Sequence, residues 1–168
     1  AKKAALLPLN GKERQTWTYL PDKFIKPEVK RQGLVIKNMS AHQRILTHGL
    51  LSSALSHRGY LEATTIMTLE QILFDITGDP IRDPELYYVS IYGKPSKAGT
   101  WGWRFEGHHI SLHFTMVNGR IFSVTPSFFG TNPAEVKEGP FKGLKVLADE
   151  EDKARKLARS LSPPQREL

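Results

Sequence analysis

The sequence predicts an α+β fold in which an αα-hairpin is followed by a three- to four-stranded antiparallel sheet and a C-terminal helix. Two observations predict it. Apolar residues recur at helical spacing within residues 40–77, whereas residues 86–125 alternate apolar and polar positions and are rich in aromatic and β-branched residues. Helices that precede strands, rather than alternating with them, are typical of α+β domains.

The first helix is expected to begin at Ser40, because Ser40 and Gln43 have the spacing of a capping box. Its apolar stripe comprises Ile45, Leu46, Leu50, Leu51, Ala54 and Leu55. Gly59 is expected to end this helix in a left-handed cap. A second helix from about Tyr60 to Ile76 then stops at Gly78, which completes the hairpin.

The strands are expected after the two Asp-Pro breaks that follow the second helix. Four segments have the composition or alternation of strands, namely 86–92, 100–106, 108–117 and 121–124. Asn118-Gly119 favours a type I′ turn between the last two. Residues 125–146 are rich in Pro and Gly and indicate a loop. The helix expected at 147–161 has an acidic first turn and basic later turns, which complements the helix dipole.

Length and composition limit the class of protein. The chain has 168 residues, of which 39% are hydrophobic, and we predict a single domain over residues 1–168. The absence of Cys excludes a disulfide framework, a thiolate zinc site and a Cys nucleophile. No apolar run reaches the ~20 residues that span a bilayer. The lack of Cys and of an initiating Met is consistent with a secreted or periplasmic protein, or with a piece of a longer chain.

Positive charge is concentrated near the N-terminus. The formal net charge is +7, and residues 1–37 form an irregular segment with nine Lys or Arg against three acidic residues. Such a segment can contact nucleic acid or another polyanion. The simpler interpretation is a solvated segment whose charges keep the chain soluble.

The chemistry-bearing residues are concentrated between Trp101 and His113. This stretch contains two Trp, an Arg, a Glu and three of the six His. In a protein without Cys, His and carboxylate groups are the usual ligands of Fe, Cu or Zn, and they are also the usual general acids and bases. Glu106 and His108 are two positions apart on a strand, about 6.6 Å along the chain, so they can share a face.

These residues suggest a metal-dependent enzyme, an oxidoreductase or a hydrolase, that acts on a small molecule. The predicted transition-metal ligands are His108, His109 and Glu106. The predicted catalytic residues are Arg104, Glu106 and His109. The residues expected to wall a substrate pocket are Trp101, Trp103, Phe128 and Asn132. Further ligands would have to come from the helices, which offer His42, His48, His57, Glu62 and Glu70.

Two alternatives stay open. In the first, His109, Ser111, His113 and Thr115 are the solvent-facing side of a half-exposed strand, and Arg104 and Glu106 form a surface ion pair worth ~0–1 kcal/mol. Without a site on that strand, the protein would be a non-enzymatic binding module, in which the basic N-terminal segment contacts nucleic acid or another polyanion and the Trp- and Tyr-rich sheet offers stacking faces. In the second, the chain is a small-molecule binding or scaffold domain without catalysis.

Two motifs carry a resemblance to a known family. Trp101-Gly-Trp-Arg-Phe-Glu-Gly-His-His-Ile-Ser-Leu and Thr125-Pro-Ser-Phe-Phe-Gly-Thr-Asn-Pro together resemble a bacterial family known as domain of unknown function number thirty-five hundred. The resemblance covers nearly the whole chain, including residues 14–21, Glu70 and residues 143–147. It implies no activity, but it implies a site around the Glu-Gly-His-His signature. The family pattern often has Asn in place of His113, and its members extend further at both ends.

Overall fold

The computed structural model describes residues 2–167, which fall into two compact units. The first unit ends at Gly130 and the second begins at Thr131. The first unit contains the helical hairpin and the sheet, and the second contains a loop followed by two helices. The predicted α+β class is confirmed, whereas the single-domain interpretation stays a prediction.

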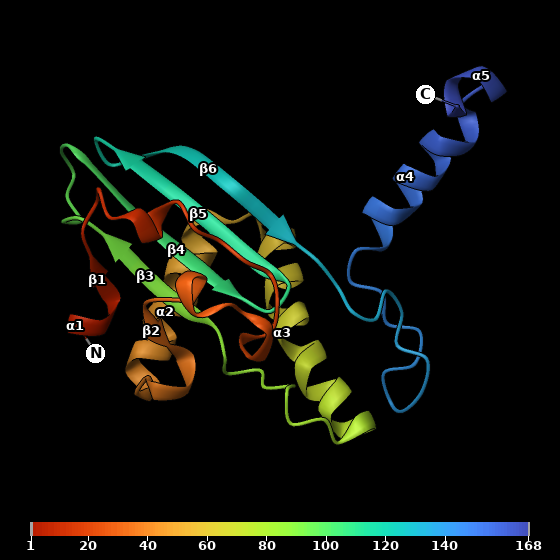
Figure 1. Ribbon diagram of the computed structural model, residues 1–168, viewed down its shortest axis with the longest axis horizontal. Helices are drawn as coiled ribbons and strands as arrows, with labels where there is room; N and C mark the ends of the chain where they lie inside the picture. Colours follow the sequence, from red (N-terminus) through yellow and green to blue (C-terminus); the bar gives the residue numbers. More distant parts are fainter. Residues whose placement is uncertain (1, 168) are drawn as a thin grey trace. The chain divides into compact units, whose positions relative to one another are not determined.

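The first unit contains one six-stranded sheet (Figure 1). Its strands are β1 (Leu6–Leu7), β2 (Leu34–Val35), β3 (Tyr88–Tyr92), β4 (Thr100–Gly107), β5 (Ile110–Val117) and β6 (Arg120–Phe129). Strands β3 to β6 form the predicted antiparallel part of the sheet, each strand paired with the next along the chain. Strands β1 and β2 both pair with β3, on the side away from β4. Strand β1 runs parallel to β3, and β2 runs antiparallel to it. They were not predicted, because two residues are too few for an alternating pattern to be visible.

Strand β6 corrects the predicted loop that begins at residue 125. It continues to Phe129, and Phe128 and Phe129 pair with Ser111 and Ile110 of β5. Pro126 suggested a loop because proline cannot donate a ladder hydrogen bond. Strand β6 is the last in the sheet order, and an edge strand tolerates a proline. The predicted Asn118-Gly119 turn is confirmed, since both residues have the positive φ that a type I′ turn needs.

The hairpin consists of α2 (Ala41–Ala54) and α3 (His57–Thr77). The capping box of Ser40 is confirmed, and Gly78 ends α3 with a φ of 67°. The prediction for Gly59 is wrong, because α2 ends at Ala54 and Gly59 lies in the first turn of α3. Ser56 is the N-cap of α3, and its side chain accepts from the backbone N–H of Gly59. A serine cap thus separates the helices where a glycine cap was expected.

Removing the hydroxyl of Ser40 tests the contribution of the capping box. We expect Ser40→Ala to lower the free energy of unfolding by ~1 kcal/mol, because the Gln43 N–H loses its acceptor. The control is Ser52→Ala in the exposed part of the same helix, expected within about 0.5 kcal/mol of wild type. Urea unfolding of the two variants measures the difference, and equal losses would contradict the capping role.

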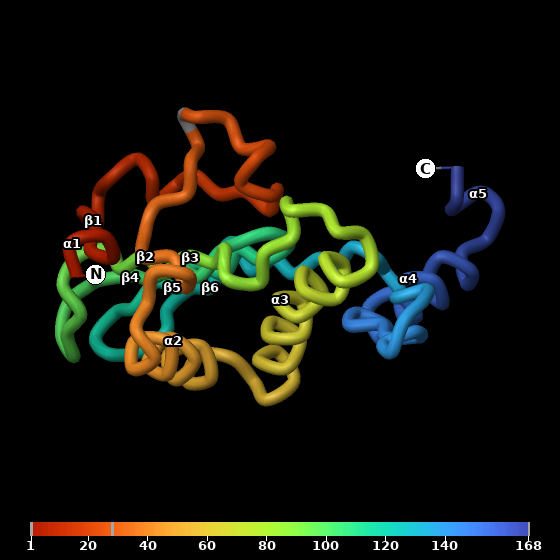
Figure 2. Tube along the Cα trace, turned by 90° about the horizontal axis from the view of Figure 1, so that it is seen from below, coloured from red at the N-terminus to blue at the C-terminus, as the bar shows by residue number. Residues whose placement is uncertain are grey.

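The two faces of the sheet are covered differently. Helices α2 and α3 lie on one face, and residues 8–33, which we call the strap, cross the other (Figure 2). The strap is irregular, as predicted, and contains three short 3₁₀ turns, Lys12–Arg14, Asp22–Phe24 and Pro27–Val29. A helix α1 (Lys2–Ala5) precedes it and a turn at Ile36–Asn38 follows it.

The face covered by the helices holds the apolar core. Trp103 and Phe114 stack with ring centroids 4.0 Å apart, and Phe105 and Leu112 are fully buried beside them. The core residues of α3 are Ala63, Ile66, Met67, Leu69 and Ile72. The predicted stripe of the first helix is partly wrong, since its first two members, Ile45 and Leu46, are 68% and 58% exposed.

The second unit contains α4 (Ala148–Ser160) and α5 (Pro163–Arg166). Helix α4 agrees with the predicted 147–161 to within one residue at each end. Its acidic first turn is tied to the next turn by Glu151, which accepts from Arg155 at 2.6 Å. Within residues 2–167, no helix is long and apolar enough to cross a membrane.

Candidate functional site

The sheet face beneath the strap is polar and buried. Its buried polar side chains are Ser90, Arg104, Glu106, Ser111 and His113. Arg104 and Glu106 are each 1% exposed, and His113 is 8% exposed. The interpretation of this face as the wet side of a strand is therefore wrong, because the strap covers it. Buried polar side chains need hydrogen-bond partners, and on this face the strap is the segment that can provide them.

Arg104 fastens the strap to the sheet. Its Nη1 donates to the carbonyls of Glu13 and Thr16, at 3.1 and 2.9 Å, and its Nη2 lies 3.1 Å from Glu106 Oε1. One guanidinium thus contacts two strap carbonyls and one oxygen of a buried carboxylate. Arg104 was expected to orient an anionic substrate group, but these contacts engage its two terminal nitrogens inside the chain.

Arg31 fastens the other end of the strap. Its Nη2 donates to the carbonyls of Thr18, Leu20 and Gly107, at 3.0, 2.8 and 2.8 Å, and its Nη1 pairs with Asp22. The bond to Gly107 ties the strap to the end of β4. Together Arg31 and Arg104 make the strap a fixed layer of the structure.

Glu106 is a buried carboxylate with an incomplete set of partners. Burial raises its pKa above the ordinary value, although the charges of Arg104 and Arg31 oppose the rise. Its Oε2 has no hydrogen-bond partner among the described residues. Its place beside Arg104 corrects the idea of a surface ion pair.

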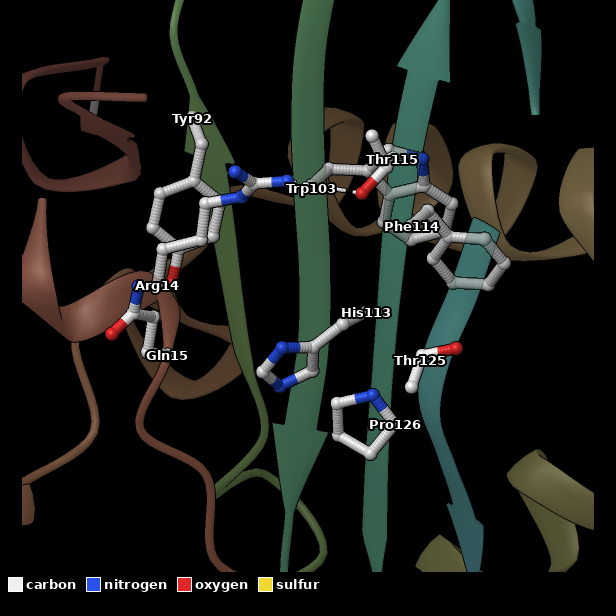
Figure 3. A pocket seen from close by; sticks show the side chains of 9 residues that line it. All are labelled: Arg14, Gln15, Tyr92, Trp103, His113, Phe114, Thr115, Thr125 and Pro126. Carbon is white, nitrogen blue, oxygen red and sulfur yellow. Dashed lines mark hydrogen bonds between the residues drawn. The ribbon is translucent and has the colours of Figure 1, made fainter. Parts of the chain in front are cut away.

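A pocket of about 350 Å³ lies between the strap and the sheet (Figure 3). Its lining residues are Arg14, Gln15, Tyr92, Trp103, His113, Phe114, Thr115, Thr125 and Pro126. Arg14 crosses from the strap and donates from Nη2 to Thr115 Oγ1 at 3.0 Å. Arg14, Gln15 and Tyr92 lie on one side of the His113 ring, and Thr125 and Pro126 lie on the other (Figure 3).

Two polar groups of this pocket are held uncharged. Burial, together with the positive charges of Arg104 and Arg14, lowers the pKa of His113 to about 3, so the imidazole is neutral near pH 7. Burial also raises the pKa of Tyr92. The Tyr92 hydroxyl oxygen is buried, and no hydrogen bond to it occurs within residues 2–167.

A tight turn at His108 and His109 joins β4 to β5. The sequence placed both residues at the start of a strand, which is wrong, because β5 begins at Ile110. His109 takes a φ of 61°, which few residues other than Gly adopt. Gly107 lets the turn pack, since a Cβ there would lie 2.3 Å from the Tyr87 ring. The Tyr87 hydroxyl donates to the His108 carbonyl at 3.0 Å and fixes the turn.

This turn contacts α3 through the His108 imidazole and the Glu70 carboxylate. His108 Nδ1 lies 2.8 Å from Glu70 Oε1, and Arg82 Nη1 lies 3.2 Å from the same oxygen. The Glu70 side chain is 3% exposed and the His108 side chain 12%. Glu70 was a candidate only if its helix packed near the strands, and α3 does so.

His109 is packed between His108 and the strap. Its ring centroid is 3.9 Å from that of His108 and 6.4 Å from that of Tyr19, and its backbone N–H donates to the Tyr19 carbonyl. Burial, together with the neighbouring His108, lowers the pKa of His109 to about 4. Its Nε2 is buried and has no hydrogen-bond partner in the described part of the chain.

The three predicted metal ligands are engaged in different contacts. Glu106 pairs with Arg104, and His108 pairs with Glu70. Among residues 2–167, no group of three or more His, Asp or Glu side chains is placed to hold a metal ion. The transition-metal prediction stays a prediction. His48 on α2 instead contacts the Tyr60 hydroxyl at 3.0 Å.

The predicted pocket walls are dispersed. Trp103 does line the pocket, but its ring stacks on Phe114 in the core. Trp101 donates from Nε1 to the Ser96 carbonyl at 3.1 Å. Phe128 packs against Trp17 and Tyr19 of the strap, with centroids 5.8 and 5.0 Å away. Asn132 belongs to the second unit.

Arg14, Tyr92 and Arg82 were not identified from the sequence. Tyr92 had a usable signal, because it alternates with Tyr88 and Ser90 on one side of β3. Arg14 lies in a segment without periodicity, so only the fold brings it to the sheet. The polyanion-binding prediction rested on the basic charge of residues 1–37, and the structure places Arg14 and Arg31 of that segment against the sheet.

The comparisons with known proteins agree with the resemblance in the sequence. Residues 1–168 match the family described as "Protein of unknown function (DUF3500)". No curated protein and no solved structure matches the chain. Since the match runs from the first residue to the last, this protein belongs to the DUF3500 family.

Proposed function

We propose that the protein is an enzyme in which His108, held by Glu70, acts as a general base. The observation that supports this proposal is the 2.8 Å contact between His108 Nδ1 and Glu70 Oε1. Two groups approach His108 Nδ1, the Glu70 carboxylate at 2.8 Å and Arg82 Nη1 at 3.3 Å. A carboxylate can only accept, so the shorter contact requires the hydrogen on Nδ1, which in the neutral ring leaves the lone pair on Nε2. An imidazole held in this tautomer can take a proton from water or from a substrate.

The surroundings of the pair suit this role. Arg82 and His108 both approach Glu70 Oε1, so two donors hold the carboxylate in position. The hydrogen bond from Tyr87 to the His108 carbonyl fixes the backbone that carries the imidazole. A base whose ring is held by a carboxylate and whose backbone is clamped loses little entropy when it reacts. The reaction class we propose is ester hydrolysis. His108 Nε2 takes a proton from water as the water oxygen bonds to the carbonyl carbon, the bond from that carbon to the alcohol oxygen then breaks, and the imidazolium gives its proton to the departing alcohol.

Hydrolysis of p-nitrophenyl acetate by the purified protein tests the proposal. We expect His108→Gln to lower kcat/KM by about 10²- to 10⁴-fold, because the proton acceptor is lost. Glu70→Gln keeps the shape of the side chain but weakens the orientation of the ring, and its expected loss is about 10- to 100-fold.

The matched control is His42→Gln, which removes an exposed imidazole from α2. It should hydrolyse the ester at the wild-type rate. Equal rates for His108→Gln, His42→Gln and wild type would contradict the proposal, as would a wild-type rate no higher than that of buffer. Circular dichroism on each variant separates loss of the base from loss of the fold.

A metal-dependent form of this enzyme is the second candidate. A histidine that binds a metal usually gives its other ring N–H to a carboxylate, and Glu70 stands in that position toward His108. The unpartnered Nε2 of His109 is the second nitrogen that favours this candidate. The ligands we propose are His108 and His109, with Fe, Cu or Zn as the ion and with water or substrate in the other positions.

Elemental analysis after chelator washing and reloading with Fe, Cu or Zn tests the second candidate. We expect one equivalent of metal in the wild type and none in a folded His108→Ala/His109→Ala variant. The absence of metal from the reloaded wild type would contradict it and would leave the metal-free mechanism in place. His42→Ala/His57→Ala, which removes two exposed histidines, should bind as the wild type does.

A further inference from the structure

The pocket beneath the strap lies on the opposite face of the sheet from the core and is separate from the pair formed by His108 and Glu70. Its volume of about 350 Å³ is at the small end of the range of ligand pockets, roughly 300–1,000 Å³. Its walls come from the strap and from β3, β4, β5 and β6, so the strap must be in place for the pocket to exist (Figure 3). A pocket of this size accommodates a compact molecule.

The charge in this pocket is positive. Arg14 uses one N–H on Thr115, and no carboxylate pairs with it in the part of the chain that the structure describes. The guanidinium carries five N–H donors, so it has donors beyond the one that Thr115 accepts. The charge of Arg104 also reaches the pocket, because it disfavours the protonated form of His113. Half-buried arginine without a counter-ion is the usual partner of a carboxylate or phosphate group.

Two uncharged groups complete the pocket. Tyr92 is 2% exposed, and its hydroxyl has a hydrogen to donate but no partner among residues 2–167. Leaving a buried hydroxyl unpaired is costly, and a ligand oxygen would satisfy it. His113 uses Nε2 on the Ser111 hydroxyl at 3.2 Å, which leaves Nδ1 for a ligand.

We propose that this pocket is a binding site for a small oxyanion, a carboxylate or phosphate group carried by a compact molecule. Arg14 supplies the charge, the Tyr92 hydroxyl donates a hydrogen bond, and neutral His113 adds a second polar contact. Thr125 and Pro126 of β6 close the side opposite the strap. The site does not depend on the base at His108, so it stands whether or not the protein is a hydrolase.

Calorimetric titration with malonate and with inorganic phosphate at neutral pH tests the site. We expect saturable binding of at least one of the two, and which one binds identifies the oxyanion. Malonamide, which has the shape of malonate without its charge, should not bind. Arg14→Gln should weaken binding at least tenfold, and Tyr92→Phe, which removes only the hydroxyl, should weaken it about three- to tenfold.

The matched control for Arg14 is Lys12→Gln, which removes an exposed charge from the same turn of the strap. It should bind the oxyanion as the wild type does. If Lys12→Gln and Arg14→Gln weakened oxyanion binding equally, binding would depend on the overall charge of the segment and not on Arg14. That result would overturn the proposed site. Failure of both malonate and phosphate to bind the folded wild type would also overturn it.

A second readout does not depend on affinity. Burial is the main reason that His113 is neutral, and the positive charges of Arg104 and Arg14 add to it. A bound oxyanion offsets those charges, so the pKa of this imidazole should rise when the ligand is added. NMR titration of the His113 ring with and without saturating malonate or phosphate measures this rise. An unchanged His113 titration in the presence of a bound anion would place that anion elsewhere on the protein.

Discussion

Arg104→Met will lower the free energy of unfolding by about 3–5 kcal/mol, the usual cost of breaking a buried ion pair by removing one partner. The loss has two sources. Glu106, at 1% exposure, keeps a carboxylate whose paired cation is gone. The carbonyls of Glu13 and Thr16 lose the Arg104 donor, although the Glu13 carbonyl still accepts from the N–H and hydroxyl of Thr16. The strap then keeps only the sheet contacts of Arg14 and Arg31 among its arginine contacts described above. Urea unfolding monitored by tryptophan fluorescence measures the loss.

The double variant Arg104→Met/Glu106→Met separates these two sources. It buries no uncompensated carboxylate, so it should regain part of the lost stability while the strap still lacks the hydrogen bonds from Arg104. Limited proteolysis should cleave residues 8–33 faster in both variants than in the wild type. Arg120→Met, an exposed arginine on β6, is the control and should change stability by less than about 0.5 kcal/mol. A double variant less stable than Arg104→Met would contradict the role of the buried charge.

Acid will destabilise the protein through His113. Its pKa is lowered to about 3 in the folded state, against an ordinary value of 6.5. As the pH falls below 6.5 the unfolded chain takes up a proton that the folded protein refuses, so this contribution is complete above pH 6.5 and is lost progressively toward pH 3. From about pH 7 to about pH 4.5 the expected loss is on the order of 2–3 kcal/mol.

His113→Asn isolates that loss. Asn is polar and does not titrate, so the variant should lose less stability between neutral and acid pH than the wild type does. His109 contributes with the same sign, because its pKa is also lowered, to about 4. Glu106 contributes with the opposite sign, since its raised pKa gives stability that is lost as the pH rises. The same loss in His113→Asn and wild type would contradict the prediction. His57→Asn, which changes an exposed histidine, should retain the wild-type loss.

Local patterns were enough to predict most of the secondary structure. Capping at Ser40, the stop at Gly78 and the Asn118-Gly119 turn depend on a few neighbouring residues, and the structure has all three. The wrong predictions concern residues whose neighbours in the sequence are compatible with two different secondary structures. Gly59 fits a helix end or a first helical turn, and the Ser56 cap decides between them. Strand β6 passes Pro126 only because it lies at an edge, which is a property of the sheet.

The candidate site was predictable in composition but not in its pairings. The concentration of His, Glu and Arg between Trp101 and His113 identified the right part of the chain. It suggested that Glu106 and His108 act together, because they are two positions apart on a presumed strand. The chain turns at His108, so its imidazole meets Glu70 of α3, while Glu106 faces the strap and pairs with Arg104. The two-residue turn at His108 and His109 therefore gives Glu106 and His108 different partners instead of bringing them together.

The sequence by itself determined the α+β class, the family and the segment that carries the polar side chains, because these depend on periodicity, capping and short motifs. The tertiary structure alone decided that the polar face of the sheet is buried. In the sequence, a buried polar face and a solvent-exposed face show the same alternation of apolar and polar residues. The two differ only in whether another part of the chain covers the polar side. The layer is an irregular strap without periodicity, held by Arg31 and Arg104 through contacts that span up to 91 positions of the chain. Contacts at such separations leave no local pattern in the residues that make them.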